Sequence, residues 1–207
     1  MQYDALIFDI DGTLWDSRSL VAAGYNKQLQ AEGLERFSVT PQQLKSLFGR
    51  VLPEIADILF GELPEEQREP LIERCSATQD KLLHEDPCEI GYPQVRETLE
   101  ALSKRYRLFI VSNSQAGYPE LCMEKLGLTP FIEGHLCFGD TRTPKGQTIL
   151  TLMDRYRISD PVYVGDTQGD YEATREAGIP FIWASYGFGQ PEHYDRKIQA
   201  ITDLLHL

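Results

Sequence analysis

The segment Ala5-Leu-Ile-Phe-Asp-Ile-Asp-Gly-Thr-Leu14 decides the fold of this chain. Its first four residues are all apolar, which predicts a strand buried on both faces. Two carboxylates follow directly, at Asp9 and Asp11, and Gly12 allows the backbone to turn sharply. Because they lie two positions apart just past a buried strand, both carboxylates can face one reaction centre. One can act as a nucleophile while the other exchanges protons.

Short apolar segments like the first one recur along the chain, with helical segments between them. The expected strands are 5–8, 108–111, 162–164 and 181–184, with a weaker one at 136–138. The expected helices are 93–105, 117–126, 147–156 and 170–177. Strands that alternate with helices indicate a parallel sheet covered on both faces. We therefore expect an α/β fold with a Rossmann-like, three-layer core.

The segment 17–89 breaks this alternation, because it contains no convincing buried strand. Its apolar positions instead predict four helices, and Thr40-Pro41 has the cap-then-proline chemistry of a helix start. The chain should therefore consist of a catalytic core, formed by residues 1–16 and 90–207, and an inserted all-helical cap, residues 17–89.

Polar residues follow three of the expected strands, at the carboxyl edge where open parallel sheets bind ligands. They are Asp9 and Asp11, Ser112 and Asn113, and Asp166 and Asp170. Four carboxylates at one edge would repel one another, and a divalent cation would relieve this repulsion. Oxygen ligands without nearby His or Cys favour Mg²⁺ over Zn²⁺.

The ordered set of motifs resembles the haloacid dehalogenase superfamily, in its phosphatase branch with a helical cap after the first motif. The matching segments are Asp9-Ile-Asp-Gly-Thr-Leu14, Ser112-Asn113, Lys145 and Gly165-Asp-Thr-Gln-Gly-Asp170. They occur in the family's order and span most of the chain. Gly146 departs from the family pattern, in which proline often follows the lysine.

The resemblance implies a role for each matching residue. Asp9 would be the nucleophile that forms an aspartyl-phosphate, and Asp11 the general acid and base. Ser112 and the backbone N–H of Asn113 would hold the phosphate, and Lys145 would steady Asp9 and the transferring group. Mg²⁺ would be bound by the side chains of Asp9 and Asp166 and the backbone carbonyl of Asp11, with Asp170 nearby or linked through water.

The carboxylate at Asp11 separates branches of this superfamily. Relatives that cleave carbon–halogen bonds usually lack it, so the resemblance implies hydrolysis or transfer of phosphate esters. The expected function is Mg²⁺-dependent hydrolysis of a small phosphate monoester, phosphoglycolate or a sugar phosphate. Two alternatives remain open at this stage: a phosphomutase like β-phosphoglucomutase, and a non-catalytic module that binds Mg²⁺ or phosphate.

The cap offers one candidate for substrate recognition. Phe48-Gly49-Arg50 resembles the specificity loop of similar caps. A guanidinium suits a carboxylate or a second phosphate, so Arg50 is a candidate substrate ligand. A solvated arginine near a helix end is the plainer interpretation.

Composition limits the partners and the compartment. The formal net charge is −12, which repels nucleic acid and anionic lipid over most of the surface. No apolar run approaches the roughly 20 residues that span a bilayer, and the first residues lack the basic segment of a signal peptide. The four cysteines lack paired spacing, which favours reduced thiols. We therefore expect a cytoplasmic monomer or homodimer that acts on a small molecule.

Overall fold

The structure is a computed structural model and describes residues 3–207. The chain divides into two compact units, one formed by Met1–Asp16 with Ile90–Leu207 and the other by Ser17–Glu89. Each unit has its own elements and its own buried side chains, and each is described by itself below.

The first unit contains a six-stranded sheet with the order β3-β2-β1-β4-β5-β6, in which all neighbouring strands are parallel. The strands are β1 (Ala5–Phe8), β2 (Arg107–Ser112), β3 (Gly134–Cys137), β4 (Pro161–Gly165), β5 (Phe181–Ala184) and β6 (Arg196–Ile198). The first strand is central and fully buried, as its apolar sequence predicts. The α/β fold class is confirmed.

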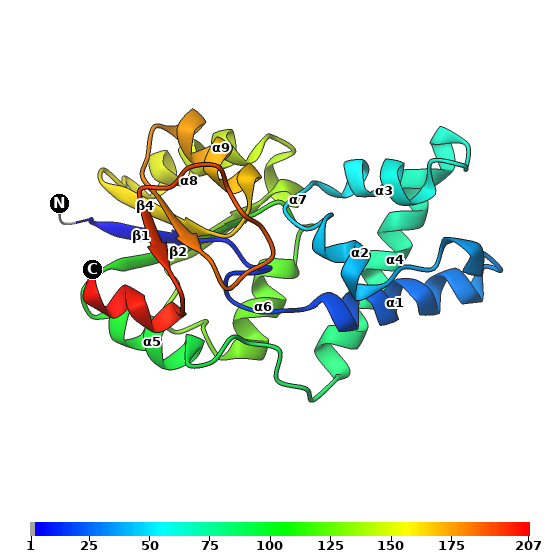
Figure 1. Ribbon diagram of the computed structural model, residues 1–207, viewed down its shortest axis with the longest axis horizontal. Coiled ribbons are helices and arrows are strands. Elements are labelled where there is room, and N and C mark those ends of the chain that lie inside the picture. The colour runs from blue at the N-terminus through cyan, green and yellow to red at the C-terminus, as the bar shows by residue number, and fades with distance from the viewer. Residues whose placement is uncertain (1–2) are drawn as a thin grey trace. The chain divides into compact units, whose positions relative to one another are not determined.

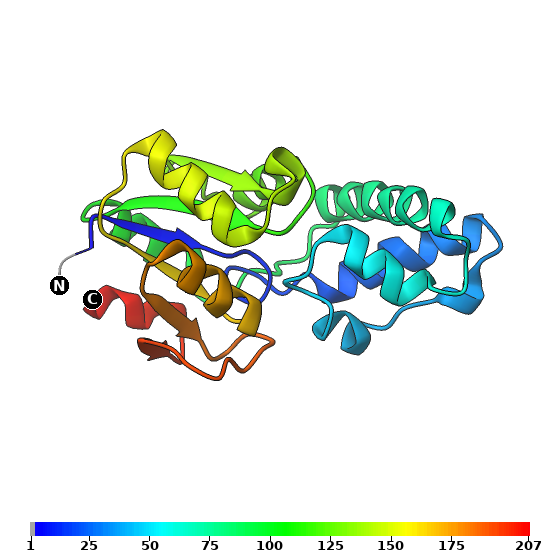
Figure 2. The same ribbon diagram turned by 90° about the horizontal axis from the view of Figure 1, so that it is seen from above.

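Helices cover both faces of this sheet. Helices α8 and α9 lie on one face, and α5 and α6 lie on the other (Figures 1 and 2). The bounds of the helices in this unit are α5 (Val95–Ser103), α6 (Tyr118–Leu126), α7 (Phe138–Thr141), α8 (Lys145–Tyr156), α9 (Gln168–Ala177) and the 3₁₀ helix η2 (Ile201–His206). Three layers result, with apolar side chains of the strands packed between them.

The sequence analysis missed the sixth strand. β6 has only three residues, and two of them, Arg196 and Lys197, are exposed at the edge of the sheet. A short, charged segment has no apolar pattern, and such residues are common on edge strands because they discourage pairing with other chains. Pairing with β5 is what makes this segment a strand.

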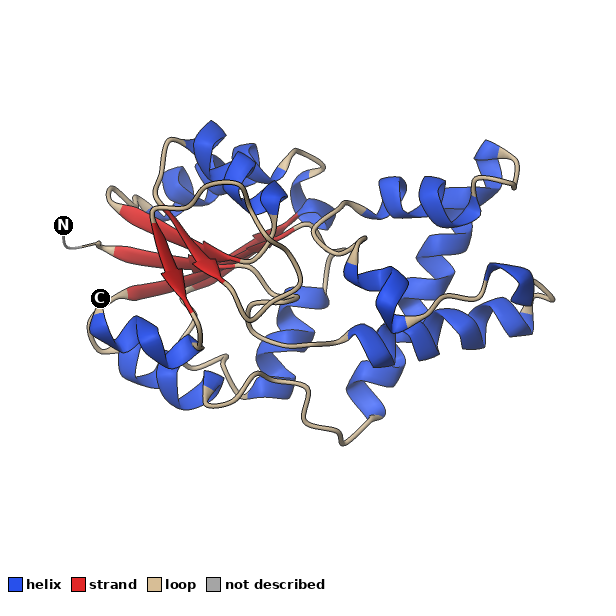
Figure 3. Cartoon of the chain, in the orientation of Figure 1, coloured by secondary structure: helices blue, strands red, loops and turns tan. Residues whose placement is uncertain are grey.

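The second unit consists of helices joined by loops, without a strand among its residues (Figure 3). The helices are α1 (Arg18–Ala31), η1 (Glu35–Phe37), α2 (Pro41–Lys45), α3 (Leu52–Phe60) and α4 (Glu65–Glu85). Thr40 caps α2 through a capping box with Gln43, and Pro41 is the first helical residue, as expected from the sequence.

Apolar side chains form the interior of the helical unit. They include Tyr25, Leu29, Phe37 and Phe60, and the rings of Phe37 and Phe60 meet edge to face at 5.8 Å. Helices α1 and α4 approach closely at Gly24, where an added Cβ would lie 2.5 Å from the Cα of Gln79.

No helix within residues 3–207 is long and apolar enough to cross a bilayer.

No disulfide joins the described cysteines; Cys75, Cys122 and Cys137 are buried and Cys88 is exposed.

Candidate active site

The central position of β1 brings the ends of three strands together. β1 pairs with β2 on one side and with β4 on the other. Asp9 follows β1 directly, and its backbone N–H donates to Val164 O at 2.9 Å. Parallel pairing in this register places the residues that follow β1, β2 and β4 at one edge of the sheet.

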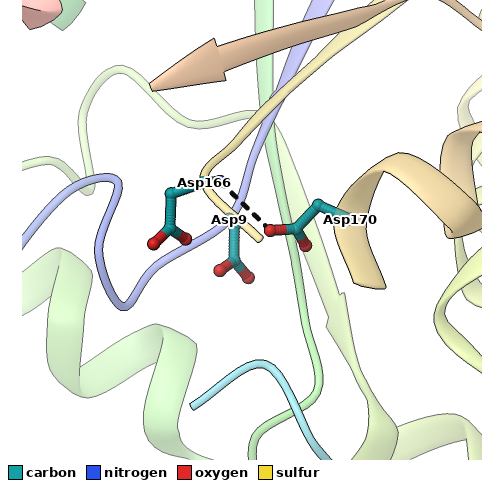
Figure 4. Close-up of side chains that lie close together, drawn as sticks. All are labelled: Asp9, Asp166 and Asp170. Atoms are coloured by element: carbon teal, nitrogen blue, oxygen red, sulfur yellow. Dashed lines mark hydrogen bonds between the residues drawn. The ribbon is translucent and has the colours of Figure 1, made fainter. Parts of the chain in front are cut away.

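Three carboxylates gather at this edge. Asp9, Asp166 and Asp170 are buried, and each offers an oxygen within 4.8 Å of the others (Figure 4). The backbone N–H of Asp166 donates to Asp170 Oδ2 at 3.1 Å, which is the dashed line in Figure 4. The side chain of Asp11 is not a member of this cluster.

Lys145 supplies a positive charge to the cluster. It is the first residue of α8, and its side chain is only 4% exposed. Its Nζ donates to Asp9 Oδ1 at 3.0 Å and to Asp170 Oδ1 at 2.6 Å. Three carboxylates and one ammonium leave two excess negative charges when all are ionised, which matches the charge of one divalent cation.

The loop after β5 contributes two backbone hydrogen-bond donors to Asp166. The backbone N–H groups of Phe188 and Gly189 donate to Asp166 Oδ2 at 2.6 and 3.3 Å. An added Cβ on Gly12 or Gly187 would collide with the Asp166 side chain, so both close approaches require glycine. Asp166 Oδ1 is buried and has no hydrogen-bond partner in residues 3–207. A buried, unpartnered carboxylate oxygen beside two other carboxylates fits a metal ion.

Asp170 belongs both to the cluster and to the start of α9. Thr167 caps this helix, and its N–H and hydroxyl both donate to Asp170 Oδ2. The other oxygen, Oδ1, accepts from Lys145. These donors fix the Asp170 carboxylate in place, so it can hold the Lys145 ammonium in position beside Asp9.

The electrostatics of the cluster differ from one carboxylate to the next. Burial raises the pKa of Asp9 to about 7, although the ammonium of Lys145 opposes this shift. Burial and the charges of Asp170 and Asp9 raise the pKa of Asp166 well above its ordinary value. Burial also disfavours the charged form of Asp170, but Lys145 and Thr167 hold its pKa below the ordinary value. Burial alone would lower the pKa of Lys145, yet Asp170 and Asp9 raise it.

Asp11 lies beside the cluster with two aromatic partners. The indole N–H of Trp15 donates to Asp11 Oδ1 at 2.8 Å, and the hydroxyl of Tyr118 donates to the same oxygen at 3.0 Å. The negative charge of Asp11 also contributes to the raised pKa of Asp9.

The remaining candidates occupy two different units. Ser112 is the last residue of β2, and its Oγ accepts from the backbone N–H of Ser114 at 3.3 Å. Asn113 follows it and is half-buried. Arg50 belongs to the helical unit, where its side chain is 50% exposed and lies 3.5 Å from Glu54.

A family model described as haloacid dehalogenase-like hydrolase matches residues 6–184, which is most of the chain. The chain belongs to this family. A phosphoglycolate phosphatase of Agrobacterium fabrum is 34% identical over 193 residues, which cover 88% of this chain and 80% of that protein. One from Aquifex aeolicus is 30% identical over 190 residues, 88% of this chain and 85% of that protein. The chain is a phosphatase.

Solved structures agree on the fold of the enzyme. A haloacid dehalogenase-like family hydrolase of Streptococcus pneumoniae superposes with a TM-score of 0.80 at 21% identity, over 99% of this chain and 97% of that one. Phosphatases of this family generally use a divalent metal, and the acidic cluster is placed to hold one. The family and the phosphatase relatives together favour the enzyme over the non-catalytic module that the sequence left open.

Three contributors to the site were missed in the sequence analysis. Trp15 and Tyr118 are not among the residues that the sequence predicts for the site, although both donate to Asp11. The loop Tyr186–Gly189 had no predicted role in the site, whereas the backbone of Phe188 and Gly189 holds Asp166. Spacing did contain a weak signal for Trp15, which lies four residues after Asp11. The other two contacts join residues more than 20 positions apart and have no local signature.

Proposed function

We propose that this phosphatase hydrolyses a small phosphate monoester through an aspartyl-phosphate on Asp9. The observation that carries the proposal is the hydrogen bond that Lys145 donates to Asp9, within a buried cluster of three carboxylates. An ammonium at hydrogen-bond distance favours the ionised, nucleophilic form of Asp9. It also lies where negative charge of the transferring group would develop.

The proposed chemistry has two steps. Asp9 attacks phosphorus, the bond from phosphorus to the leaving oxygen breaks, and that oxygen takes a proton from Asp11. Asp11, now ionised, takes a proton from a water molecule, whose oxygen attacks phosphorus. The bond from phosphorus to Asp9 then breaks, which releases inorganic phosphate and restores both carboxyl groups to their starting forms.

Divalent metal chemistry supports this sequence of steps, and we propose Mg²⁺ as the ion. Asp9 and Asp166 would hold it through their side chains and Asp11 through its backbone carbonyl, with Asp170 close by. When bound, the ion would offset the charges of the carboxylates and of the transferring phosphoryl group. The oxygen-only donor set of the cluster favours this hard cation.

We propose phosphoglycolate as the substrate, because the two relatives described above are named phosphoglycolate phosphatases. Ser112 and the backbone N–H of Asn113 would bind the phosphoryl group, and Arg50 the carboxylate of the leaving group. The site residues of the core recognise only phosphate, so discrimination between leaving groups requires a further element such as the helical cap.

The test measures phosphate release from 2-phosphoglycolate and from β-glucose 1-phosphate, with Mg²⁺ and with EDTA. We expect hydrolysis of 2-phosphoglycolate that EDTA abolishes and that Asp9→Asn eliminates. A phosphomutase would instead convert β-glucose 1-phosphate to an isomer in the presence of glucose 1,6-bisphosphate. Wild-type rates in Asp9→Asn, with deamidation excluded by mass spectrometry, would refute the nucleophile.

A further inference from the structure

Two buried aromatic side chains converge on one oxygen of the proposed general acid. Trp15 and Tyr118 are both fully buried, and their rings meet edge to face at 5.4 Å. Each donates a hydrogen bond to Asp11 Oδ1, at 2.8 and 3.0 Å. No family motif quoted above includes either residue.

The backbone around this pair is itself fixed. Trp15 O accepts from the N–H of Gly12, and Trp15 forms β-bridges with Asp11 and with Gly91. Tyr118 is the first residue of α6 and follows Gly117, whose φ of +87° suits only glycine. Two separate segments of the core unit therefore carry the two donors to a single atom.

Two donors on one oxygen fix the orientation of a carboxyl group that would otherwise turn. The torsion that rotates an Asp carboxyl is broad and has no sharp minimum. Donors in two different directions on Oδ1 restrict this rotation, and they occupy the lone pairs of that oxygen. The proton that Asp11 transfers must then reside on Oδ2.

We propose that Trp15 and Tyr118 are positioning residues that orient Asp11, so that Oδ2 delivers the proton to the leaving oxygen. The inference rests on the proposed function, because it assumes that Asp11 is the general acid. The pair acts through Asp11 and not on the substrate. Its loss should therefore weaken protonation of the leaving group and leave phosphate recognition unchanged.

The experiment compares kcat/KM for phenyl phosphate and p-nitrophenyl phosphate, in the Mg²⁺-loaded enzyme. The two esters are similar in size, but phenolate is the poorer leaving group and depends more on a proton donor. For Tyr118→Phe, which removes only one oxygen atom, we expect kcat/KM to fall about tenfold with phenyl phosphate, a part of the 10²–10⁴ supplied by general acid–base catalysis. With p-nitrophenyl phosphate the loss should be less than about twofold, because that leaving group needs little protonation.

Two further variants complete the test. Trp15→Phe should show the same selective loss, whereas Tyr106→Phe, a tyrosine whose hydroxyl lies near the C-terminal residue Leu207, should resemble wild type. In an Asp11→Asn background, Tyr118→Phe should cause no further loss with phenyl phosphate, because no acid remains to be oriented.

Equal losses on both esters, or no loss in Tyr118→Phe, would overturn the positioning role. Additive losses in the double variant would overturn it as well. The proposed function fails separately: it is refuted if Asp11→Asn itself keeps wild-type kcat/KM with phenyl phosphate.

Discussion

The two units of this protein have opposite interiors. The core unit buries three carboxylates with oxygens within 4.8 Å of one another, and an ammonium that donates hydrogen bonds to two of them. The helical unit buries an apolar cluster and leaves its ion pairs at the surface, as for Arg50 with Glu54. Buried charges are costly unless paired, so evolution keeps them where chemistry requires them. This difference fits the proposal that the core unit carries out the chemistry, and it leaves the helical unit as a candidate for substrate recognition.

The largest effect should come from removing the one ammonium in the buried cluster. Lys145→Met leaves Asp9, Asp166 and Asp170 without their positive partner, and breaking a buried pair in this way costs about 3–5 kcal/mol of stability. We expect urea unfolding to show this loss, together with loss of activity. Lys81→Met in the helical unit is the control: its side chain is 69% exposed, so its effect should stay within about 0.5 kcal/mol. Equal effects of the two variants would contradict the contrast between the units.

Metal binding should stabilise the protein more at high pH than at low pH. Burial raises the pKa of Asp9 from 3.8 to about 7. In the folded, metal-free protein this shift lowers stability progressively as pH rises from about 4 to about 7, because the unfolded chain loses its proton first. The proposed Mg²⁺ would bind the ionised carboxylates and so remove this penalty.

We therefore expect Mg²⁺ to raise Tm more at pH 8 than at pH 5, by thermal unfolding of the same sample. At a concentration 100 times the dissociation constant, the gain would be about 2.7 kcal/mol. Asp166→Asn should reduce it, because this change removes one proposed ligand. A larger Tm gain at pH 5 would contradict the proposed ligand set.

A change inside the helical unit should affect stability without affecting the metal. Gly24→Ala places a Cβ 2.5 Å from the Cα of Gln79, so α1 and α4 must move apart. Alanine is the better helix former by about 1 kcal/mol, but overpacking typically costs about 1–3 kcal/mol. We expect net destabilisation in urea and an unchanged Mg²⁺ titration. Ala23→Leu, on the exposed side of α1, should leave both unchanged. A weaker Mg²⁺ titration in Gly24→Ala would show that the two interiors are coupled.

The smallest effect on stability should come from Arg50→Ala. Its exposed pair with Glu54 contributes at most about 1 kcal/mol. If Arg50 binds the leaving group, kcat/KM for 2-phosphoglycolate should fall about tenfold, which equals about 1.4 kcal/mol. p-Nitrophenyl phosphate has no carboxylate, so its hydrolysis should hardly change. Similar losses of kcat/KM on both substrates would show that Arg50 supports the fold and does not recognise the leaving group.

Local patterns were sufficient for most of the architecture. The apolar runs 5–8 and 181–184 are the strands β1 and β5 as the structure has them, because a strand buried on both faces must be apolar at every position. Helices α6 and α9 end at Leu126 and Ala177, as expected, and each is followed by a glycine with positive φ that terminates the helix. The edge strand β6 could not be predicted, because its sequence has no apolar pattern and only its pairing with β5 makes it a strand.

The sequence by itself predicted that carboxylates gather at one edge of the sheet, whereas tertiary structure decided how each is held. Carboxylates that follow buried parallel strands indicate a ligand site, because these strands end at the same edge of the sheet. That Lys145 bridges Asp9 and Asp170, 136 and 25 positions away, follows only from the packing of α8 beside the sheet. The Tyr118 donor on Asp11 Oδ1 depends likewise on where α6 begins, 107 residues downstream. Distances between side chains far apart along the chain are set by how the elements pack, and no local pattern records them.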